Sequence, residues 1–173
     1  MKKLTKLISN KELKKRIKEL ADIIDKKYNS EPCVFVSVLK GSIFFYTELL
    51  KNIKNKNINM DFIQVKSYVG TNTTGNIQVV KDCSTDITGK NLIIVEDIID
   101  TGITANFLYD YFLQRNPQDI MMCSLLQKPT KLEANLKLNT LVGFEIEDKF
   151  IVGYGLDLDE KFRNLQDIYI YNQ

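Results

Sequence analysis

Residues 95–104 read Val-Glu-Asp-Ile-Ile-Asp-Thr-Gly-Ile-Thr, and no other stretch says as much about this chain. The apolar segment 91–95 predicts a strand before it, and residues 105–115 predict a helix after it. Glycine and hydroxyl residues at a strand-to-helix turn predict a phosphate-binding loop, because unpaired backbone N–H groups and the helix dipole both face the anion. Three acids in the same turn would repel a bare phosphate. They indicate a phosphorylated sugar bound with a divalent cation such as Mg²⁺.

The segments on either side predict an α/β fold with a mainly parallel sheet covered by helices. Ser9 and Glu12 form a capping-box pair, which predicts a helix over 10–27. The apolar run 34–39 predicts a buried parallel strand, and a helix is expected over 43–51. Further strands are expected at 58–68, 76–82, 120–126, 141–146, 150–154 and 168–171. In such sheets ligands bind at the carboxyl ends of the strands, where residues 95–104 lie.

Composition restricts the chemistry that this chain can perform. Its 173 residues are 44% hydrophobic and 27% charged, which predicts a single globular domain. Histidine is absent, so Ser–His and Cys–His nucleophile pairs and His-ligated zinc sites are excluded. Three widely spaced cysteines indicate a reducing compartment rather than a disulfide framework. Because no segment looks like a signal peptide or a membrane span, a cytoplasmic protein is expected.

The net charge of +2 is unevenly distributed along the chain. Residues 1–60 hold 14 Lys or Arg and 6 Asp or Glu, whereas residues 61–173 hold 10 and 16. A basic first third could contact nucleic acid, an anionic substrate or an acidic partner. The simpler interpretation is a solvated helix face.

The stretch 95–104 resembles the phosphoribosyl-pyrophosphate signature of the type I phosphoribosyltransferases, in which two acids follow a hydrophobic strand and Asp-Thr-Gly-x-Thr follows them. The resemblance implies that family's twisted, mainly parallel sheet flanked by helices, in one domain over 1–173. It also implies a small base-binding hood built from the N-terminal and C-terminal segments. The implied sugar-phosphate site comprises Glu96, Asp97, Asp100, Thr101, Gly102, Ile103 and Thr104.

Within this site the resemblance implies separate roles. Glu96 and Asp97 would bind the ribose hydroxyls directly or through Mg²⁺, and residues 101–104 would hold the 5′-phosphate. Asp100 would be the catalytic base that accepts the proton of purine N7. Ile103 stands where some family members have Lys, so phosphate affinity would depend on N–H groups and the Thr hydroxyls.

Two further loops resemble parts of the same family. The turn Leu39-Lys40-Gly41-Ser42 resembles the loop with which 6-oxopurine phosphoribosyltransferases bind pyrophosphate, since glycine lets the backbone approach an anion and Lys40 adds charge. Ser67 and Tyr68 match the pair that begins the family's catalytic lid, which is expected over about 67–76. A flexible hairpin tip is the alternative interpretation of that segment.

The C-terminal part resembles the hypoxanthine-guanine phosphoribosyltransferases along residues 142–157. The resemblance implies that Phe150 stacks on the purine, that the Ile151 backbone contacts the ring edge, and that Asp157, in the base-binding region, helps to hold a second Mg²⁺. Arg163 would bind pyrophosphate. Lys128 would donate to the 6-oxo group, and because an ammonium can only donate, it favours a 6-oxopurine over a 6-aminopurine.

The implied reaction is transfer of the phosphoribosyl group from phosphoribosyl pyrophosphate to N9 of hypoxanthine or guanine, giving IMP or GMP in purine salvage. One alternative is a phosphoribosyltransferase-fold regulator that binds nucleic acid and senses phosphoribosyl pyrophosphate. Another is a transferase for a different base. The preference among hypoxanthine, guanine and xanthine is not readable from side chains. Nucleic-acid and membrane partners are not expected, whereas a homodimer or homotetramer is.

Overall fold

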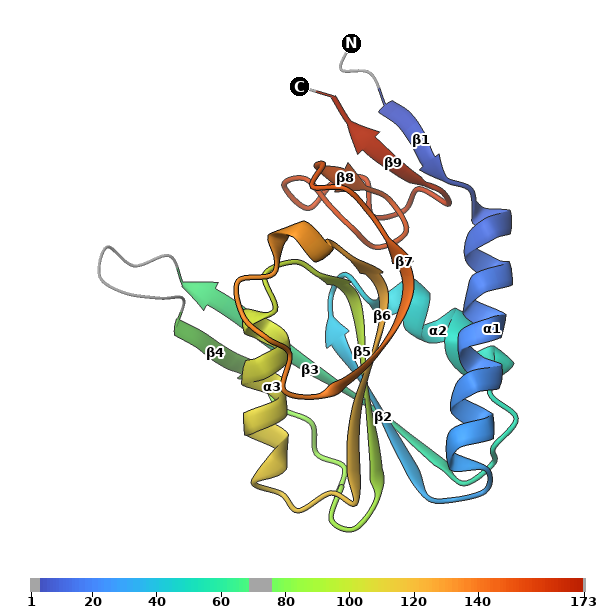
Figure 1. Cartoon of the computed structure of the whole chain (residues 1–173), viewed down its shortest axis with the longest axis vertical. Helices are drawn as coiled ribbons and strands as arrows, with labels where there is room; N and C mark the ends of the chain where they lie inside the picture. Colours follow the sequence, from blue (N-terminus) through green and yellow to red (C-terminus); the bar gives the residue numbers. More distant parts are fainter. Residues whose placement is uncertain (1–3, 69–75, 173) are drawn as a thin grey trace.

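Continuous apolar strands form the central sheet. The computed structural model describes residues 4–68 and 76–172, and over these residues six strands pair in the order β4-β3-β2-β5-β6-β7 (Figure 1). They are β2 (Cys33–Leu39), β3 (Ile58–Tyr68), β4 (Asn76–Lys81), β5 (Asn91–Ile99), β6 (Asp119–Gln127) and β7 (Asn139–Glu145). All neighbouring pairs are parallel except β3 and β4. The predicted mainly parallel sheet is therefore confirmed.

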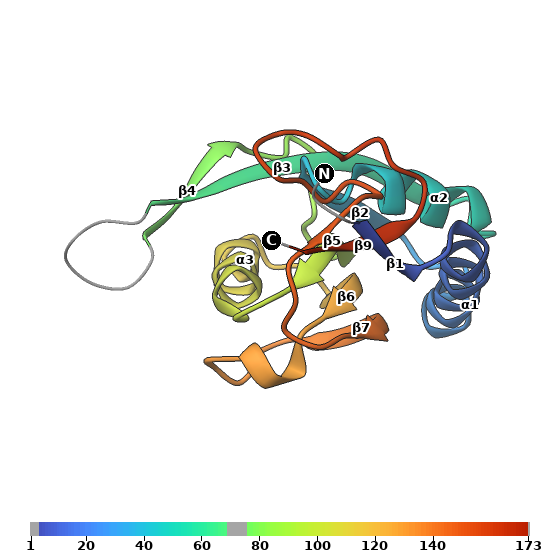
Figure 2. The same cartoon turned by 90° about the horizontal axis from the view of Figure 1, so that it is seen from above.

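Helices cover both faces of this sheet (Figure 2). Helices α1 (Asn10–Tyr28) and α2 (Ile43–Asn52) pack on one face, and α3 (Ile103–Leu113) packs on the other. Successive side chains of a strand point to opposite faces, so Phe35 of β2 joins the core under α1 and α2 while Val34 and Val36 join the core under α3. Strand β2 is consequently apolar on both sides. None of the helices in the described part of the chain is long and apolar enough to cross a membrane.

Helix α1 begins at the predicted capping box. The Ser9 side chain accepts a hydrogen bond from the Glu12 N–H at 3.3 Å, and the Glu12 carboxylate accepts one from the Ser9 N–H at 2.9 Å. Leu13, Ile17 and Leu20 form a stripe at helical spacing, and all three are fully buried. Burial of each such side chain stabilises the fold by about 2 kcal/mol, so packing rather than the cap holds the helix in place.

A second, smaller sheet is built from the two ends of the chain. Strands β1 (Leu4–Ile8), β9 (Ile168–Tyr171) and β8 (Ile151–Val152) pair antiparallel in the order β1-β9-β8. This sheet lies beyond the carboxyl ends of the parallel strands (Figure 1). Strand β1 was not predicted, because Thr5 and Lys6 interrupt its apolar pattern and its pairing depends on β9, over 160 residues further along the chain.

Strand β5 is longer than predicted. The sequence indicated a strand that ends at Val95, but β5 continues through Glu96 and Asp97 to Ile99. Pairing with β6 persists to the register pair Ile99 and Gln127, so the ladder outlasts the apolar run. The two acids therefore lie on a strand and not in a turn. The 3₁₀ turn Pro129–Lys131 was also not predicted, and the strand expected at 150–154 shortens to β8.

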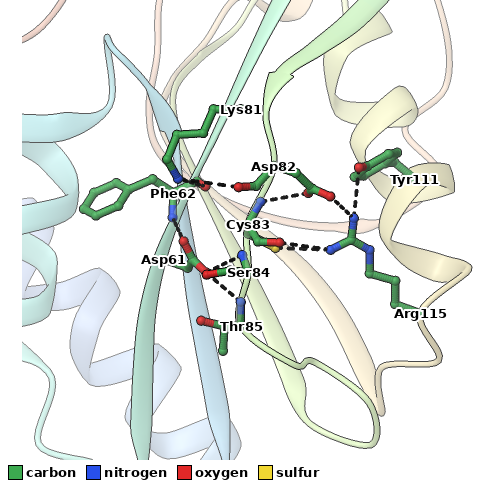
Figure 3. A network of polar contacts seen from close by, with 9 residues as sticks. All are labelled: Asp61, Phe62, Lys81, Asp82, Cys83, Ser84, Thr85, Tyr111 and Arg115. Carbon is green, nitrogen blue, oxygen red and sulfur yellow. Dashed lines mark hydrogen bonds and ion pairs between the residues drawn. The ribbon is translucent and has the colours of Figure 1, made fainter.

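The base of the β3–β4 hairpin is held by one buried carboxylate, Asp61 of β3 (Figure 3). It accepts hydrogen bonds from the backbone N–H groups of Phe62 at 2.7 Å and of Ser84 and Thr85 at 2.8 Å. Burial by itself raises the pKa of Asp61, but these hydrogen bonds outweigh it and lower the pKa to about 2. The segment after β4 is thereby fixed to β3.

The same segment is also tied to α3. Arg115, just beyond the C-terminal end of α3, forms an ion pair with Asp82 at 2.5 Å and donates to the Cys83 carbonyl at 3.3 Å (Figure 3). Its guanidinium further donates to the Tyr111 hydroxyl at 2.9 Å. The segment after β4 and helix α3 are thus linked directly.

We expect Asp61→Asn to lower the free energy of unfolding at pH 7 by about 2 kcal/mol, since a pKa held at about 2 instead of 3.8 corresponds to that difference. The pKa is lower in the folded protein, so the stabilisation is complete above about pH 4 and is lost as the pH falls towards 2. Urea unfolding of the native protein and of Asp61→Asn between pH 2 and pH 7 measures this difference in the free energy of unfolding. The control Asp86→Asn removes an exposed carboxylate that caps its own loop through Thr88. A gap between Asp61→Asn and the native protein that does not shrink in acid would contradict this account.

Candidate active site

Three loops meet because the parallel strands end at one edge of the sheet. Leu39 ends β2, Glu96 to Thr104 span the end of β5 and the start of α3, and Lys128 follows β6. The first two border a pocket of about 230 Å³, and Lys128 Nζ lies 3.8 Å from Oδ1 of Asp100, one of the lining residues. Its lining includes six residues of the predicted site, namely Leu39, Glu96, Asp100, Thr101, Gly102 and Thr104. The position that the sequence predicted for the site is therefore where the structure has a concave surface.

The start of α3 has the form of an anion-binding loop. Gly102 precedes the helix with φ at +84°, a conformation that glycine adopts without strain, and it offers no side chain to cap the helix. The Ile103 N–H donates to the Thr101 hydroxyl at 3.4 Å, which tightens the turn. The first N–H groups of a helix have no partner within the helix, so they are available to a phosphate group.

Glu96 and Asp97 form a pair of acids at the end of β5. Glu96 is only 8% exposed. Burial, and then the adjacent charge of Asp97, raise the pKa of Glu96 well above its usual value, and burial raises the pKa of Asp97. The Asp97 carboxylate packs directly over Gly41, where any side-chain carbon would overlap it. The pair thus brings negative charge against the glycine of the predicted pyrophosphate loop.

This pair suits a hard cation. Carboxylate oxygens are the donors that Mg²⁺ prefers, and Mg²⁺ is typically held by one or two carboxylates together with phosphate oxygens of the substrate. Within residues 4–68 and 76–172 no group of three or more acids, cysteines or histidines converges to hold a metal ion by itself. Asp157 does not join the pair, because its carboxylate is bound by Arg163 at 2.8 Å and by the Glu160 N–H at 2.8 Å.

Asp100 is one member of a ring of four side chains of alternating charge. Its Oδ2 lies 3.2 Å from Lys131 Nζ, and its Oδ1 lies 3.8 Å from Lys128 Nζ. Asp148 Oδ1 contacts both lysines, at 3.0 Å from Lys128 and 3.6 Å from Lys131. The Lys128 side chain is only 8% exposed, so this ammonium is buried among carboxylates. Neither Lys131 nor Asp148 was singled out from the sequence, because a charged residue in a loop carries no signal until the fold closes the ring.

The segment after β8 closes over the predicted pyrophosphate loop. Gly155, with φ at +104°, lies so close to the Gly41 carbonyl that a side-chain carbon would overlap it. Arg163 donates to the Gly155 carbonyl at 2.7 Å and pairs with Asp157, and Lys40 pairs with Glu160 at 2.9 Å. The peptide bond between Leu39 and Lys40 is cis. The contact between the two glycines was not predicted, since nothing in either segment's sequence points to the other.

Two of the predicted base-binding residues, Phe150 and Ile151, lie at the small sheet, just before and at the start of β8. Phe150 is 46% exposed, and its ring contacts that of Tyr171 edge-on at 6.0 Å between centroids. Ile151 is buried in β8 and pairs with Ile170 of β9. An aromatic ring held on one edge and exposed elsewhere offers a surface on which a planar base can stack.

In the described part of the chain two buried side-chain atoms accept or donate no hydrogen bond, Asp100 Oδ1 and Arg163 Nε. Buried polar atoms are normally satisfied, and both exceptions belong to the predicted site. Of the predicted lid, Ser67 and Tyr68 end β3, paired with Ile77 and Asn76 of β4. Residues 69–75 of the lid lie outside the described residues.

A family model and curated relatives were compared with this chain, and both are phosphoribosyltransferases. The sequence matches the phosphoribosyl transferase domain model over residues 4–159. The chain belongs to the phosphoribosyltransferase family. It is 40% identical over 171 residues to the hypoxanthine-guanine phosphoribosyltransferase of Aquifex aeolicus, covering 98% of this chain and 95% of that protein. It is 39% identical over 160 residues to the enzyme of the same name from Bacillus subtilis, covering 92% and 88%.

Solved structures of phosphoribosyltransferases agree with the fold. A hypoxanthine-guanine phosphoribosyltransferase from Bacillus anthracis superposes with a TM-score of 0.89 at 43% identity, covering 97% of this chain and 96% of that one. The hypoxanthine phosphoribosyltransferase of Trypanosoma cruzi, solved with its product IMP, gives 0.89 at 33% identity, covering 99% and 95%. The predicted family and fold are confirmed, while the roles of individual residues stay predictions.

We expect Gly155→Ala to weaken binding of phosphoribosyl pyrophosphate by about tenfold or more, because its methyl group would push the Gly41 loop away (tenfold equals about 1.4 kcal/mol). Gly89→Ala is the matched control, since Gly89 also has a positive φ, +66°, but no atom lies within 4 Å of the added carbon. It should cost about 1 kcal/mol of stability and leave binding unchanged. Calorimetric titration and urea unfolding measure both effects. Equal binding by the two variants would contradict the role of this contact.

Proposed function

We propose that this chain transfers the phosphoribosyl group from phosphoribosyl pyrophosphate to N9 of a 6-oxopurine, hypoxanthine or guanine, and releases pyrophosphate. The product would be IMP or GMP, which places the chain in purine salvage. The single observation that supports this most is the unpartnered Oδ1 of Asp100, a pocket-lining residue, beside the buried Lys128, which sets an acceptor and a donor next to each other. The relatives named above are enzymes, and they give the nucleic-acid-binding regulator no support.

Charge around the pocket favours this reaction. As pyrophosphate leaves C1 of the ribose, that carbon becomes positive, and the acids at the end of β5 stabilise it where it forms. The backbone at residues 101–104 binds the 5′-phosphate. Lys40 and Arg163, at 2.9 and 3.1 Å from Glu160, exchange that contact for the departing pyrophosphate. The buried Arg163 Nε has no hydrogen-bond partner and is free to donate to it.

The metal requirement follows from the same acids. We propose that Glu96 and Asp97 hold Mg²⁺ together with oxygens of phosphoribosyl pyrophosphate, and bound Mg²⁺ would neutralise charge on the leaving pyrophosphate. Burial raises the pKa of Asp97, and the positive charge of the Arg163 guanidinium opposes this in part. Arg163 therefore acts electrostatically on the acid pair. A second Mg²⁺ at Asp157 requires that this carboxylate release Arg163.

Base recognition uses the donor and acceptor beside the pocket. Lys128 donates to the 6-oxo group, and the Asp100 carboxylate accepts the N7 proton as N9 attacks. Phe150 stacks on the ring, and the Ile151 backbone contacts its edge. We assign the hood to the small sheet β1-β9-β8 and the lid to the β3–β4 hairpin with residues 67–76, within a single domain. Cytoplasmic location and assembly as a dimer or tetramer complete the proposal.

Pyrophosphate release by the purified protein tests the reaction. The assay contains Mg²⁺, phosphoribosyl pyrophosphate and, separately, hypoxanthine, guanine, xanthine or adenine. We expect turnover with 6-oxopurines and none with adenine, because the Lys128 ammonium cannot accept from a 6-amino group. Turnover with adenine alone would indicate a transferase for another base. No turnover with any base, despite tight binding of phosphoribosyl pyrophosphate, would contradict the proposed function.

We expect Asp100→Asn to lower kcat about a hundredfold or more, the contribution typical of a positioned acid or base. Affinity for phosphoribosyl pyrophosphate should change little, because the amide keeps the shape of the side chain. Steady-state kinetics and calorimetric titration separate the two quantities. The control is Asp110→Asn, a surface acid of α3 paired with Lys137. Equal losses of turnover and of affinity would exclude Asp100 as the proton acceptor.

Light scattering measures the assembly state. We expect a mass of at least twice the 20.0 kDa of one chain. A stable monomer with full activity would contradict the proposed assembly.

A further inference from the structure

The four-charge ring around Asp100 contains two residues to which the proposed reaction gives no task. Lys131 lies in the turn after β6, and Asp148 lies in the loop between β7 and β8. The contacts Asp100–Lys131, Lys131–Asp148, Asp148–Lys128 and Lys128–Asp100 measure 3.2, 3.6, 3.0 and 3.8 Å. Two of the four are hydrogen-bonded ion pairs, and the longest contact joins Asp100 and Lys128, the two groups to which the proposed reaction assigns the base.

The long contact is the informative one. A lysine and an aspartate left alone at this spacing would close to a direct hydrogen bond of about 2.8 Å, which would satisfy both and leave neither for a ligand. Here each has another partner. Lys131 donates to Asp100 Oδ2, and Asp148 accepts from Lys128, so Asp100 Oδ1 and the remaining hydrogens of Lys128 stay uncommitted.

The spacing also matches the chemistry of a 6-oxopurine. N7 and O6 lie side by side on one edge of the base. A base that loses the N7 proton while its O6 accepts a hydrogen bond needs an acceptor and a donor next to each other and not bonded to one another. Asp100 can serve as this acceptor and Lys128 as this donor only while Lys131 and Asp148, the outer half of the ring, hold these two inner side chains apart.

We propose that Lys131 and Asp148 are positioning residues that keep Asp100 and Lys128 separate and oriented towards the N7–O6 edge of the purine. Lys131 acts on Asp100, and Asp148 acts on Lys128 and links the two lysines. This inference rests on the proposed function, since it assigns the roles of N7 acceptor and O6 donor to the inner pair. Neither outer residue touches the substrate.

The outer pair contributes little to folding, which makes its effect on catalysis measurable. The Lys131 side chain is 40% exposed and that of Asp148 is 52% exposed, and ion pairs between exposed side chains of this kind contribute little to the stability of a protein. Loss of either charge should therefore leave the fold intact. Its effect should appear in the geometry of the inner pair.

The test compares Lys131→Gln with Lys131→Arg and with the control Lys137→Gln. Lys137 lies in the same segment and pairs with Asp110 of α3 at 2.5 Å, with a side chain 49% exposed, but it is remote from Asp100. We expect Lys131→Gln to lower kcat about tenfold, a part of the hundredfold or more that a positioned base contributes. KM for phosphoribosyl pyrophosphate and the unfolding midpoint should match those of Lys137→Gln.

Lys131→Arg keeps the positive charge and should restore kcat to within about threefold of the native value. Asp148→Asn should raise KM for hypoxanthine about tenfold, because the Lys128 ammonium loses the acceptor that directs it. Its control is Glu147→Gln, which removes an exposed acid paired only with its neighbour Lys149 among the described contacts. That control should leave KM for hypoxanthine unchanged.

Three outcomes would overturn the inference. One is a kcat of Lys131→Gln equal to that of Lys137→Gln. Another is an equal loss of kcat and of affinity for phosphoribosyl pyrophosphate together with a lower unfolding midpoint, which would show a structural role. The third is failure of Lys131→Arg to restore kcat. The native protein is assayed first, so an inactive native protein contradicts the proposed function, whereas an active one with an unaffected Lys131→Gln contradicts this inference alone.

Discussion

The candidate site depends on the parallel pairing of β5 with β2 and β6. Because all three strands run the same way, their carboxyl ends share one edge of the sheet, and each loop that follows a strand opens there. Residues that are more than 50 positions apart, such as Gly41 and Asp97, are thereby in direct contact. An antiparallel neighbour for β5 would place one of these loops at the other end of the molecule. The chemistry of the site is a consequence of strand direction.

Close packing then determines the electrostatics of that edge. Gly41 lies against both Asp97 and Gly155, so two glycines allow an acid pair, a basic loop and the segment of Arg163 to converge. Burial of Glu96 and Asp97 raises the pKa of both groups, which is costly for a protein without ligand. Such a cost is typical of a site arranged to receive a cation, because the bound charge relieves the repulsion. Asp100 Oδ1 and Arg163 Nε are likewise buried without a hydrogen-bond partner, a cost that a bound ligand would relieve.

The molecule contains two charged networks that differ in how far their polar atoms are satisfied. At the base of the hairpin Asp61 is fully satisfied by backbone N–H groups, and its pKa falls to about 2 (Figure 3). Around Asp100 the charges alternate in a ring that leaves one oxygen without a hydrogen bond. The first arrangement stabilises a fold, since every polar group has its partner. The second keeps capacity for a ligand, and on that difference we base the assignment of one as structural and the other as part of the reaction.

The sequence by itself determined the fold class and the order of most elements, and it predicted the place of the candidate site. Local signals carry this information: the capping box at Ser9, the continuous apolar strands and the Asp-Thr-Gly-x-Thr turn are all readable over a few residues. Tertiary structure alone decided the length of β5, the existence of β1, the contact of Gly41 with Gly155 and the ring that joins Lys131 and Asp148 to Asp100. Each of these depends on partners distant in the chain, and a residue's own neighbours in sequence do not encode which distant group will neutralise its charge or complete its hydrogen bonds.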